Sequence, residues 1–423
     1  MDSSRLALMN PWWGDPARYI DDRAFQLLFA SPVYFQNPLL DELPLDGRPF
    51  YIIRGPRQVG KTTFLRLLIR KQIMEKKFLP ENILFLSCES LSRFSDVIDA
   101  VEPWLVQFRG TKTLVVLDEV SFVPEWQRAV LHLDNTGQLA DTTMFITGSN
   151  ARDLKQSSEK FPGRRYGGKD LQFYPLSPFQ LAELPAFKDQ SLDQVLRIYE
   201  SVGGFPHALD SYSRLGYVES DVYETYKNWI VGDAARYRLH EETLKHILYR
   251  IFLCCPSRIT WPQLIENTPV KSHETALEYV EHLHDAFICN VVYCYDRANA
   301  GPAFHKARKI FFVDPLLYYV AKGWKMGFFD LRDDVAALTA QPEFRGGLFE
   351  SYVSSFLSRS ESIFFWYSTK EKKEVDIVRT KAQVIELWDC KLSDAAPYTA
   401  MNASERVQIL TPERFLERFH PKK

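Results

Sequence analysis

The segment with the clearest chemistry is Gly55-Pro-Arg-Gln-Val-Gly-Lys-Thr-Thr63, which has the spacing G-x-x-x-x-G-K-T. It follows an apolar run, 50–53, and precedes a helical pattern over 62–74, which is the context of a phosphate-binding loop. Glycines let backbone N–H groups close around phosphate oxygens, the helix start adds its positive dipole end, and the lysine adds a fixed charge. We therefore expect a nucleoside triphosphate to be bound by Gly55, Gln58, Val59, Gly60, Lys61, Thr62 and Thr63.

Carboxylates for the same site are expected at the end of a neighbouring strand. The apolar run 114–117 is followed directly by Asp118 and Glu119. We expect Thr62 and Asp118 to hold Mg²⁺, while Glu119 polarises the water that attacks the γ-phosphate and Lys61 stabilises the phosphate charge. A solvated strand end is the alternative interpretation of the acidic pair.

A further strand is expected to reach this site. The apolar run 143–146 ends in small polar residues, and we expect Asn150 among them to contact the nucleotide. An ordinary turn is the alternative at this position.

A second group of charged residues lies toward the C-terminal end. Glu350 falls on a helical pattern, and Asp376 lies near the start of a strand pattern. Asp389 and Lys391 share one face of the next strand, because side chains alternate along a strand. Such carboxylates can hold one or two Mg²⁺ ions, and the lysine can stabilise an attacking water. Acids and lysines at strand ends are common, so a fold kept only as a scaffold is the alternative.

The elements that must position these residues change in type along the chain. Short apolar runs alternate with helical patterns from 50 to 175, which predicts a parallel sheet flanked by helices. A mainly helical region follows, and then a helix, a short helix, a helix and two strands, the pattern of a winged helix. We predict an N-terminal arm over 1–48, a core over 49–185, a helical lid over 186–240, a winged helix over 241–325 and an α/β domain over 335–423.

Composition limits the class of protein. The 423 residues are 46% hydrophobic and 25% charged, which excludes an intrinsically disordered chain and predicts more than one domain. The formal charge of −2 excludes a positive field over the whole protein, so any binding of nucleic acid must use local patches. No membrane-spanning run and no signal peptide are found, so we expect a cytoplasmic protein without a membrane partner, whose six cysteines are reduced.

Two regions are candidates for contact with nucleic acid. The longer helix of the winged-helix pattern, over 273–287, carries four acids and no lysine or arginine, which favours a structural or inter-subunit role over reading of bases. Trp12 and Trp13 could stack on bases, but anchoring of the N-terminal arm is the favoured interpretation.

Several motifs together resemble a family, the prokaryotic AAA-type P-loop ATPases with a C-terminal PD-(D/E)xK nuclease-like domain of uncharacterised function. They are the phosphate loop, Ile146-Thr-Gly-Ser149, Gly163-Arg164-Arg165, Tyr174-Pro-Leu-Ser177, Gly203-Gly-Phe-Pro206 and Gly346-Gly-Leu-Phe-Glu350. The resemblance implies an α/β fold: an AAA-type parallel sheet with a helical lid and a winged helix, followed by a restriction-endonuclease-like α/β domain. It also implies ATP and Mg²⁺ as ligands, and Glu350, Asp376, Asp389 and Lys391 as a nuclease site.

In such ATPases an arginine of one subunit reaches the γ-phosphate bound by its neighbour, and Arg164 or Arg165 is expected to be that catalytic residue. A basic pair that only contacts solvent is the alternative. A homo-oligomer, with a hexamer as one expected form, follows from it. The function expected is ATP hydrolysis coupled to remodelling, translocation or nuclease-linked processing of DNA. The alternatives are an ATP-dependent signalling or defence switch with a scaffold-only end domain, and a DNA endonuclease gated by ATP.

Overall fold

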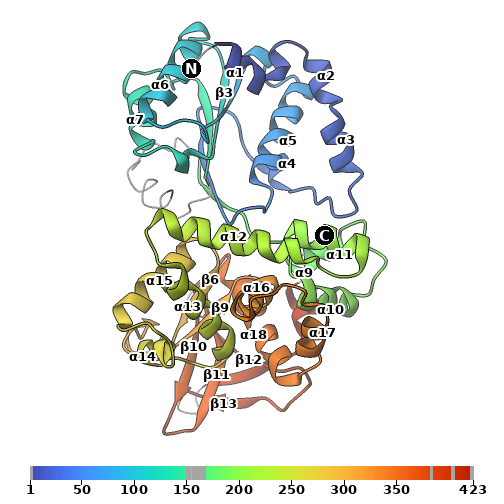
Figure 1. Ribbon diagram of the computed structural model, residues 1–423, viewed down its shortest axis with the longest axis vertical. Coiled ribbons are helices and arrows are strands. Elements are labelled where there is room, and N and C mark those ends of the chain that lie inside the picture. Colours follow the sequence, from blue (N-terminus) through green and yellow to red (C-terminus); the bar gives the residue numbers. More distant parts are fainter. Residues whose placement is uncertain (1–2, 149–153, 155–167, 382–383, 402–404, 420–423) are drawn as a thin grey trace. The chain divides into compact units, whose positions relative to one another are not determined.

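A computed structural model describes residues 3–148, 154, 168–381, 384–401 and 405–419. The chain divides into two compact units, Met1–Tyr174 and Pro175–Lys423 (Figure 1). Each unit is a fold in its own right and is described separately. None of the helices in the described part of the chain is long and apolar enough to cross a membrane.

The first unit is built on a five-stranded parallel sheet, as predicted. Its strands run in the order β2-β3-β4-β1-β5. Parallel strands buried on both faces need continuous apolar runs, which is what the sequence carries here. The bounds are Phe50–Arg54 for β1, Ile83–Ser87 for β2, Thr113–Asp118 for β3, Thr142–Thr147 for β4 and Asp170–Gln172 for β5.

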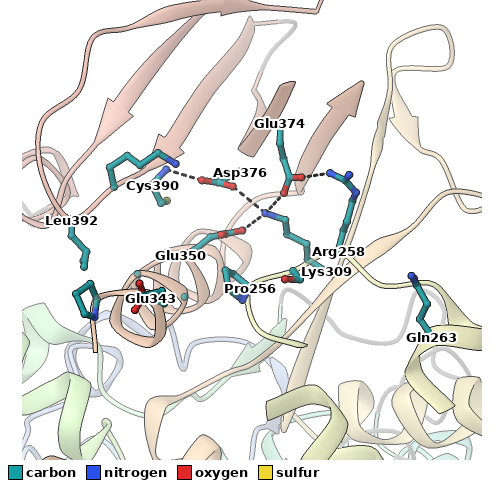
Figure 2. Close-up of a pocket in the computed structure, with 15 residues that line it drawn as sticks. Pro256, Arg258, Gln263, Lys309, Glu343, Glu350, Glu374, Asp376, Cys390 and Leu392 are labelled. Atoms are coloured by element: carbon teal, nitrogen blue, oxygen red, sulfur yellow. Dashed lines mark hydrogen bonds and ion pairs between the residues drawn. The ribbon is translucent and has the colours of Figure 1, made fainter. Parts of the chain in front are cut away.

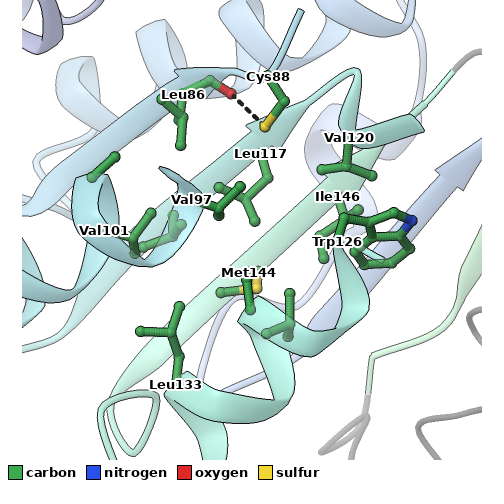
Figure 3. Packing of buried hydrophobic residues seen from close by; sticks show 14 of the residues in the cluster. Leu86, Cys88, Val97, Val101, Leu117, Val120, Trp126, Leu133, Met144 and Ile146 are labelled. Carbon is green, nitrogen blue, oxygen red and sulfur yellow. Dashed lines mark hydrogen bonds between the residues drawn. The ribbon is translucent and has the colours of Figure 1, made fainter. Parts of the chain in front are cut away.

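Alternation of side chains sends neighbouring residues of each strand to opposite faces of this sheet. On β3, Leu114 and Val116 pack with helix α5 (Lys61–Met74). Val115 and Leu117 pack on the other face, with helices α6 (Phe94–Gln107) and α7 (Gln127–Asn135). Figure 3 shows this second cluster, in which Leu117, Met144 and Ile146 of the sheet face Val97, Val101 and Leu133 of the helices. Two apolar layers therefore hold the sheet rigidly between helices.

The N-terminal arm is anchored to the sheet, as the favoured interpretation predicted. The indole N–H groups of Trp12 and Trp13 both donate to the backbone oxygen of Ile83, at 3.1 and 2.8 Å. Trp12 is buried in the apolar cluster that includes α5. The arm comprises α1 (Ser3–Met9), η1 (Pro11–Trp13), α2 (Pro16–Ile20), α3 (Arg23–Phe29) and α4 (Leu39–Glu42).

The second unit begins with helices and then forms a small antiparallel strand pair. Its first helices are α9 (Pro178–Ala182), α10 (Leu192–Val202), α11 (Pro206–Leu215), α12 (Ser220–Arg236), α13 (Glu241–Cys254), α14 (Trp261–Ile265) and α15 (His273–Asp285). Strand β6 (Cys289–Tyr293) then pairs with β9 (Arg308–Phe312), and the short β7 (Tyr295–Asp296) and β8 (Gly301–Pro302) lie between them in sequence. This is the order of helices and strands expected over 241–325, whereas the name winged helix stays a prediction.

A mixed sheet completes the second unit. Its order is β10-β11-β12-β14-β13, in which β12 and β14 are parallel and the other neighbours are antiparallel. The bounds are Ile363–Ser368 for β10, Lys373–Lys381 for β11, Val384–Cys390 for β12, Tyr398–Ala400 for β13 and Glu405–Leu410 for β14. The helices nearest in sequence are α16 (Pro315–Met326), α17 (Arg332–Thr339), α18 (Pro342–Ser358) and α19 (Pro412–Phe419).

The pair Gly203 and Gly204 has a packing role inside this unit. A Cβ atom on Gly203 would lie 2.0 Å from Oδ1 of Asp314, and one on Gly204 would lie 1.9 Å from the backbone oxygen of Leu176. The N–H group of Gly204 donates to Oδ2 of Asp314 at 2.8 Å, and Asp314 also caps α16. Both positions therefore require glycine.

Candidate functional sites

The phosphate-binding loop predicted from the sequence joins β1 to α5 and closes tightly on itself. Gly55 has a φ of +154°, and a Cβ there would lie 2.3 Å from the backbone oxygen of Phe173, so only glycine fits. Lys61 is the first residue of α5, and its Nζ donates to the backbone oxygens of Gly55 and Pro56 at 3.0 and 2.7 Å. The loop thus surrounds a largely buried ammonium group.

The start of α5 is suited to an anion. Gly60 is the N-cap residue with a φ of +89°, and no side chain caps the helix there. The first N–H groups of any helix have no acceptor inside the helix, and the helix dipole adds partial positive charge. Gln58 also has positive φ, at 61°, and Val59 packs against the apolar cluster beneath α5. These features fit the phosphates of a nucleotide.

Asp118 is held next to this loop by two hydroxyl groups. Thr62 Oγ1 donates to Asp118 Oδ2 at 2.9 Å, and Thr147 Oγ1 donates to Oδ1. Burial raises the pKa of Asp118, and the two hydroxyl hydrogen bonds lower it less. The sheet order explains the meeting, because β4 lies between β3 and β1 and all three strands end at the same edge. Carboxylate and hydroxyl oxygens side by side fit Mg²⁺.

Glu119 directly follows β3 in the left-handed region, with a φ of 56°. Its N–H group donates to Thr147 Oγ1 at 3.1 Å, so one hydroxyl orders both acidic residues. Thr147 is one of the small polar residues predicted to end strand β4 near the nucleotide, but its contacts with Asp118 and Glu119 were not predicted. Asn150, Arg164 and Arg165 lie outside the described residues.

The charged residues predicted near the C-terminal end do meet, but around a residue that was not predicted. Figure 2 shows the ammonium group of Lys309 pointing between three carboxylates. Its Nζ lies 2.5 Å from Glu350 Oε1, 2.7 Å from Glu374 Oε1 and 3.0 Å from Asp376 Oδ1. We call Glu350, Glu374 and Asp376 the carboxylate cage.

Asp389 and Lys391 complete this region. Lys391 Nζ lies 3.1 Å from Asp389 Oδ2, and Asp376 Oδ2 accepts a hydrogen bond from the N–H group of Cys390 at 3.0 Å. Burial, followed by a hydrogen bond and the negative charge of Asp376, raises the pKa of Asp389 to about 7. All four residues of the predicted nuclease site are therefore close together: Glu350 on α18, Asp376 on β11, Asp389 near the end of β12 and Lys391 directly after it.

A cavity of about 740 Å³ opens beside the carboxylate cage. It is lined by Lys309, Lys391 and Arg258 together with the three acids of the cage. Arg258 forms an ion pair with Glu374, as Figure 2 shows. The cavity is wide enough to admit a ligand and is rich in charge of both signs.

The cage, as it stands, does not fit a divalent ion. One oxygen of each acid already contacts the Lys309 ammonium group. Across the residues that the structure describes, no three His, Cys, Asp or Glu side chains are arranged to hold a metal ion. A signal for Lys309 existed, because it stands in the apolar run Lys309-Ile-Phe-Phe-Val313 and a buried charge must be paired. The nuclease role stays a prediction.

Comparison with known protein families gives two matches. Residues 47–184 match the AAA domain, and residues 193–326 match a domain of unknown function, DUF8612. No curated protein matches the chain. The first match covers the sheet, the loop and both acids of the nucleotide site.

Solved structures give more distant likenesses. The Aeropyrum pernix ORC2 protein, in ADPNP and ADP complexes, is 13% identical, with a TM-score of 0.39, over 77% of this chain and 99% of that one. The ORC1 protein of the same organism, in complex with DNA, is 14% identical, with a TM-score of 0.32, over 80% and 99%. AMPPCP-bound DnaA from Aquifex aeolicus is 13% identical, with a TM-score of 0.32, over 63% and 88%.

Proposed function

Residues 47–184 form an AAA domain of the P-loop ATPase type, and from this premise we propose that the protein hydrolyses ATP with Mg²⁺. The observation that carries the proposal is the 2.9 Å hydrogen bond between Thr62 Oγ1 and Asp118 Oδ2, beside the loop that surrounds Lys61. A hydroxyl after the loop lysine and an acid at a strand end are the two oxygen ligands that such a site needs for Mg²⁺.

Each residue has a defined task in this proposal. Lys61 and the N–H groups at the start of α5 bind the phosphates and offset their charge. Thr62 and Asp118 would hold Mg²⁺, which supplies further neutralisation of phosphate charge. Glu119 orients and polarises the attacking water, and Thr147 positions both acids. We keep Arg164 or Arg165 as the catalytic arginine supplied by a neighbouring subunit, and Asn150 as a nucleotide contact.

Nucleotide binding and turnover of three variants test the ATP site. Lys61→Ala should lose ATP binding, whereas Glu119→Gln should keep binding and lose turnover by about 100-fold or more, because only proton transfer to the base is removed. Lys71→Ala is the matched control, since it removes a lysine from the same helix that pairs with Asp41 and Glu75 instead. The proposal fails if Lys61→Ala binds and hydrolyses ATP like the parent. Native mass with and without ATP tests the homo-oligomer.

We further propose two versions of what ATP turnover drives. In the first, it remodels, translocates on or helps to cut DNA. In the second, ATP acts through a signalling or defence switch and the nuclease-like end is a scaffold. The position of Lys309 supports the scaffold, because the ammonium group already uses the carboxylates that a metal would need.

Assays with duplex, branched and single-stranded DNA separate these versions. Faster ATP turnover with any of them supports action on DNA, and no effect supports the switch. Cleavage with Mg²⁺ that is lost in Asp389→Asn, while ATP turnover is kept, would establish the nuclease and contradict the scaffold. The expected result is no cleavage.

A further inference from the structure

We propose that the carboxylate cage is a cation site permanently filled by the Lys309 ammonium group, and that removing this group would turn the cage into a site for a divalent metal ion. The inference concerns the second unit alone and does not depend on ATP hydrolysis. It goes beyond the scaffold interpretation, because it states what blocks the site and how the block can be removed.

The first support is the match between donors and acceptors. A lysine ammonium group has three N–H donors and no acceptor. Lys309 meets one oxygen from each of three acids, at 2.5, 2.7 and 3.0 Å, so all its donors have a charged acceptor. The acids come from two elements, Glu350 on α18 and Glu374 and Asp376 on β11, while the lysine comes from β9. This is how a protein surrounds a bound cation.

The second support is burial and charge. Only 1% of Lys309 and 4% of Glu350 are exposed, so neither charge is stabilised by bulk water. Three carboxylate oxygens within 3.0 Å of Nζ offset the positive charge of Lys309. The lysine therefore stays charged and serves as the counter-ion of the cage.

The third support is that Lys309 cannot easily leave. Its strand, β9, is paired residue by residue with β6, where Lys309 lies opposite Val292. Aromatic packing also holds the side chain, whose Nζ lies 5.5 Å from the ring centre of Phe365. A divalent ion entering from the cavity would meet a fixed positive charge at the centre of the cage. Shortening or neutralising this side chain would leave carboxylate oxygens beside a water-accessible space, which are the ligands that Mg²⁺ and Mn²⁺ prefer.

Binding of Mn²⁺ alone, without nucleotide, tests the proposal in the full chain. All proteins carry Asp118→Asn, so that the metal ligand of the nucleotide site is removed. Free Mn²⁺ is followed by electron paramagnetic resonance. The parent should bind no Mn²⁺ at the cage, and Lys309→Met should bind one ion per chain. Adding Asp376→Asn to Lys309→Met should abolish that binding.

Lys391→Met is the matched control, because it removes the other lysine of the same cavity, which pairs with Asp389 and lies outside the cage. It should create no Mn²⁺ site. If Lys391→Met creates the same site as Lys309→Met, the effect is a general loss of positive charge and the proposal is overturned.

Thermal unfolding covers the case in which Lys309→Met is poorly folded, since it leaves the acids without their counter-ion. A ligand that binds only the folded state stabilises it, so Mn²⁺ should raise the Tm of Lys309→Met and leave the parent unchanged. The proposal is overturned if the parent binds Mn²⁺ and introducing Asp376→Asn abolishes that binding. It is equally overturned if Lys309→Met is folded but binds no Mn²⁺, or stays unfolded when Mn²⁺ is added.

Discussion

The side-chain amide of Asn10 pairs with the backbone of Phe85 as a neighbouring strand would. Asn10 Oδ1 accepts from the Phe85 N–H group at 2.6 Å, and Asn10 Nδ2 donates to the Phe85 oxygen at 2.9 Å. Phe85 lies on β2, the strand at one end of the sheet order, and Asn10 is fully buried. One side chain therefore satisfies part of an open sheet edge, which is otherwise a site of aggregation.

Replacing Asn10 tests this relationship. Asn10→Ala should lower the free energy of unfolding by about 1–3 kcal/mol, because buried backbone groups of Phe85 lose their partners. Denaturant unfolding measures the loss, and light scattering should reveal earlier aggregation. Leu8→Ala, in the same arm but 83% exposed, should change stability little. Equal losses in both variants would show that the arm contributes only general packing.

Gly55→Ala should disrupt the loop by more than backbone strain alone. An alanine at positive φ costs about 1–2 kcal/mol, and here the new Cβ would also clash with the immovable backbone oxygen of Phe173 at 2.3 Å. Both the free energy of unfolding and ATP affinity should fall. Gly110→Ala is the control for strain alone, because its φ is +79° and nothing lies within 4 Å of the added atom. The clash is refuted if the two variants lose the same stability.

Thr147→Val should reduce ATP turnover about tenfold, since it removes the hydroxyl that orders Asp118 and Glu119, a loss of about 1.4 kcal/mol. The dependence on Mg²⁺ should also shift to higher concentration. Thr143→Val is the matched control on the same strand, where the buried hydroxyl donates to the Leu45 oxygen at 3.0 Å, away from the site. Steady-state kinetics at varied Mg²⁺ measures both. If Thr147→Val has the same ATP turnover and Mg²⁺ dependence as the parent, Thr147 has no role in the nucleotide site.

Asp314 should make the second unit less stable as the pH rises. Burial raises the pKa of Asp314 from 3.8 to about 7, although N–H groups of Gly204 and Leu316 lower it. The folded state then holds a proton that the unfolded state lacks, so stability is highest below the ordinary pKa. It is lost as the pH rises toward about 7, with a limiting slope of about 1.4 kcal/mol per pH unit.

Denaturant unfolding of the full chain at several pH values between 3.8 and about 7 measures how the free energy of unfolding changes with pH. Asp314→Asn, which cannot ionise, should have a slope smaller by up to about 1.4 kcal/mol per pH unit, because other buried acids such as Asp389 still contribute. The exposed Asp189→Asn should keep the slope of the parent. An equal slope in Asp314→Asn and the parent would assign the pH dependence to other groups.

The parts of the molecule that the sequence predicted are those set by local patterns. Apolar runs such as Leu114–Leu117 predict the strands of the parallel sheet. The G-x-x-x-x-G-K-T spacing predicts the phosphate-binding loop, because few other structures need glycines at these positions. The contact between Thr62 and Asp118 could also be predicted, because the carboxyl ends of parallel strands lie at the same edge of the sheet.

The contacts that were not predicted join distant segments of the chain. Thr147 reaches Asp118 only because β4 lies between β3 and β1, an order that no local pattern encodes. Lys309 meets Asp376 from 67 positions away in the chain. A charged residue among apolar neighbours needs a partner in the fold, but the local sequence does not show which residue that partner is.

This distance along the chain has a consequence for the segment that matches DUF8612. The segment, 193–326, includes Lys309 but ends before Glu350, Glu374 and Asp376. A fragment cut at residue 326 would lose the three acids that pair with Lys309, together with the parts of α18 and β11 that cover it. Such a fragment should not fold alone. A chimaeric protein that contains this segment must also contain the three acids.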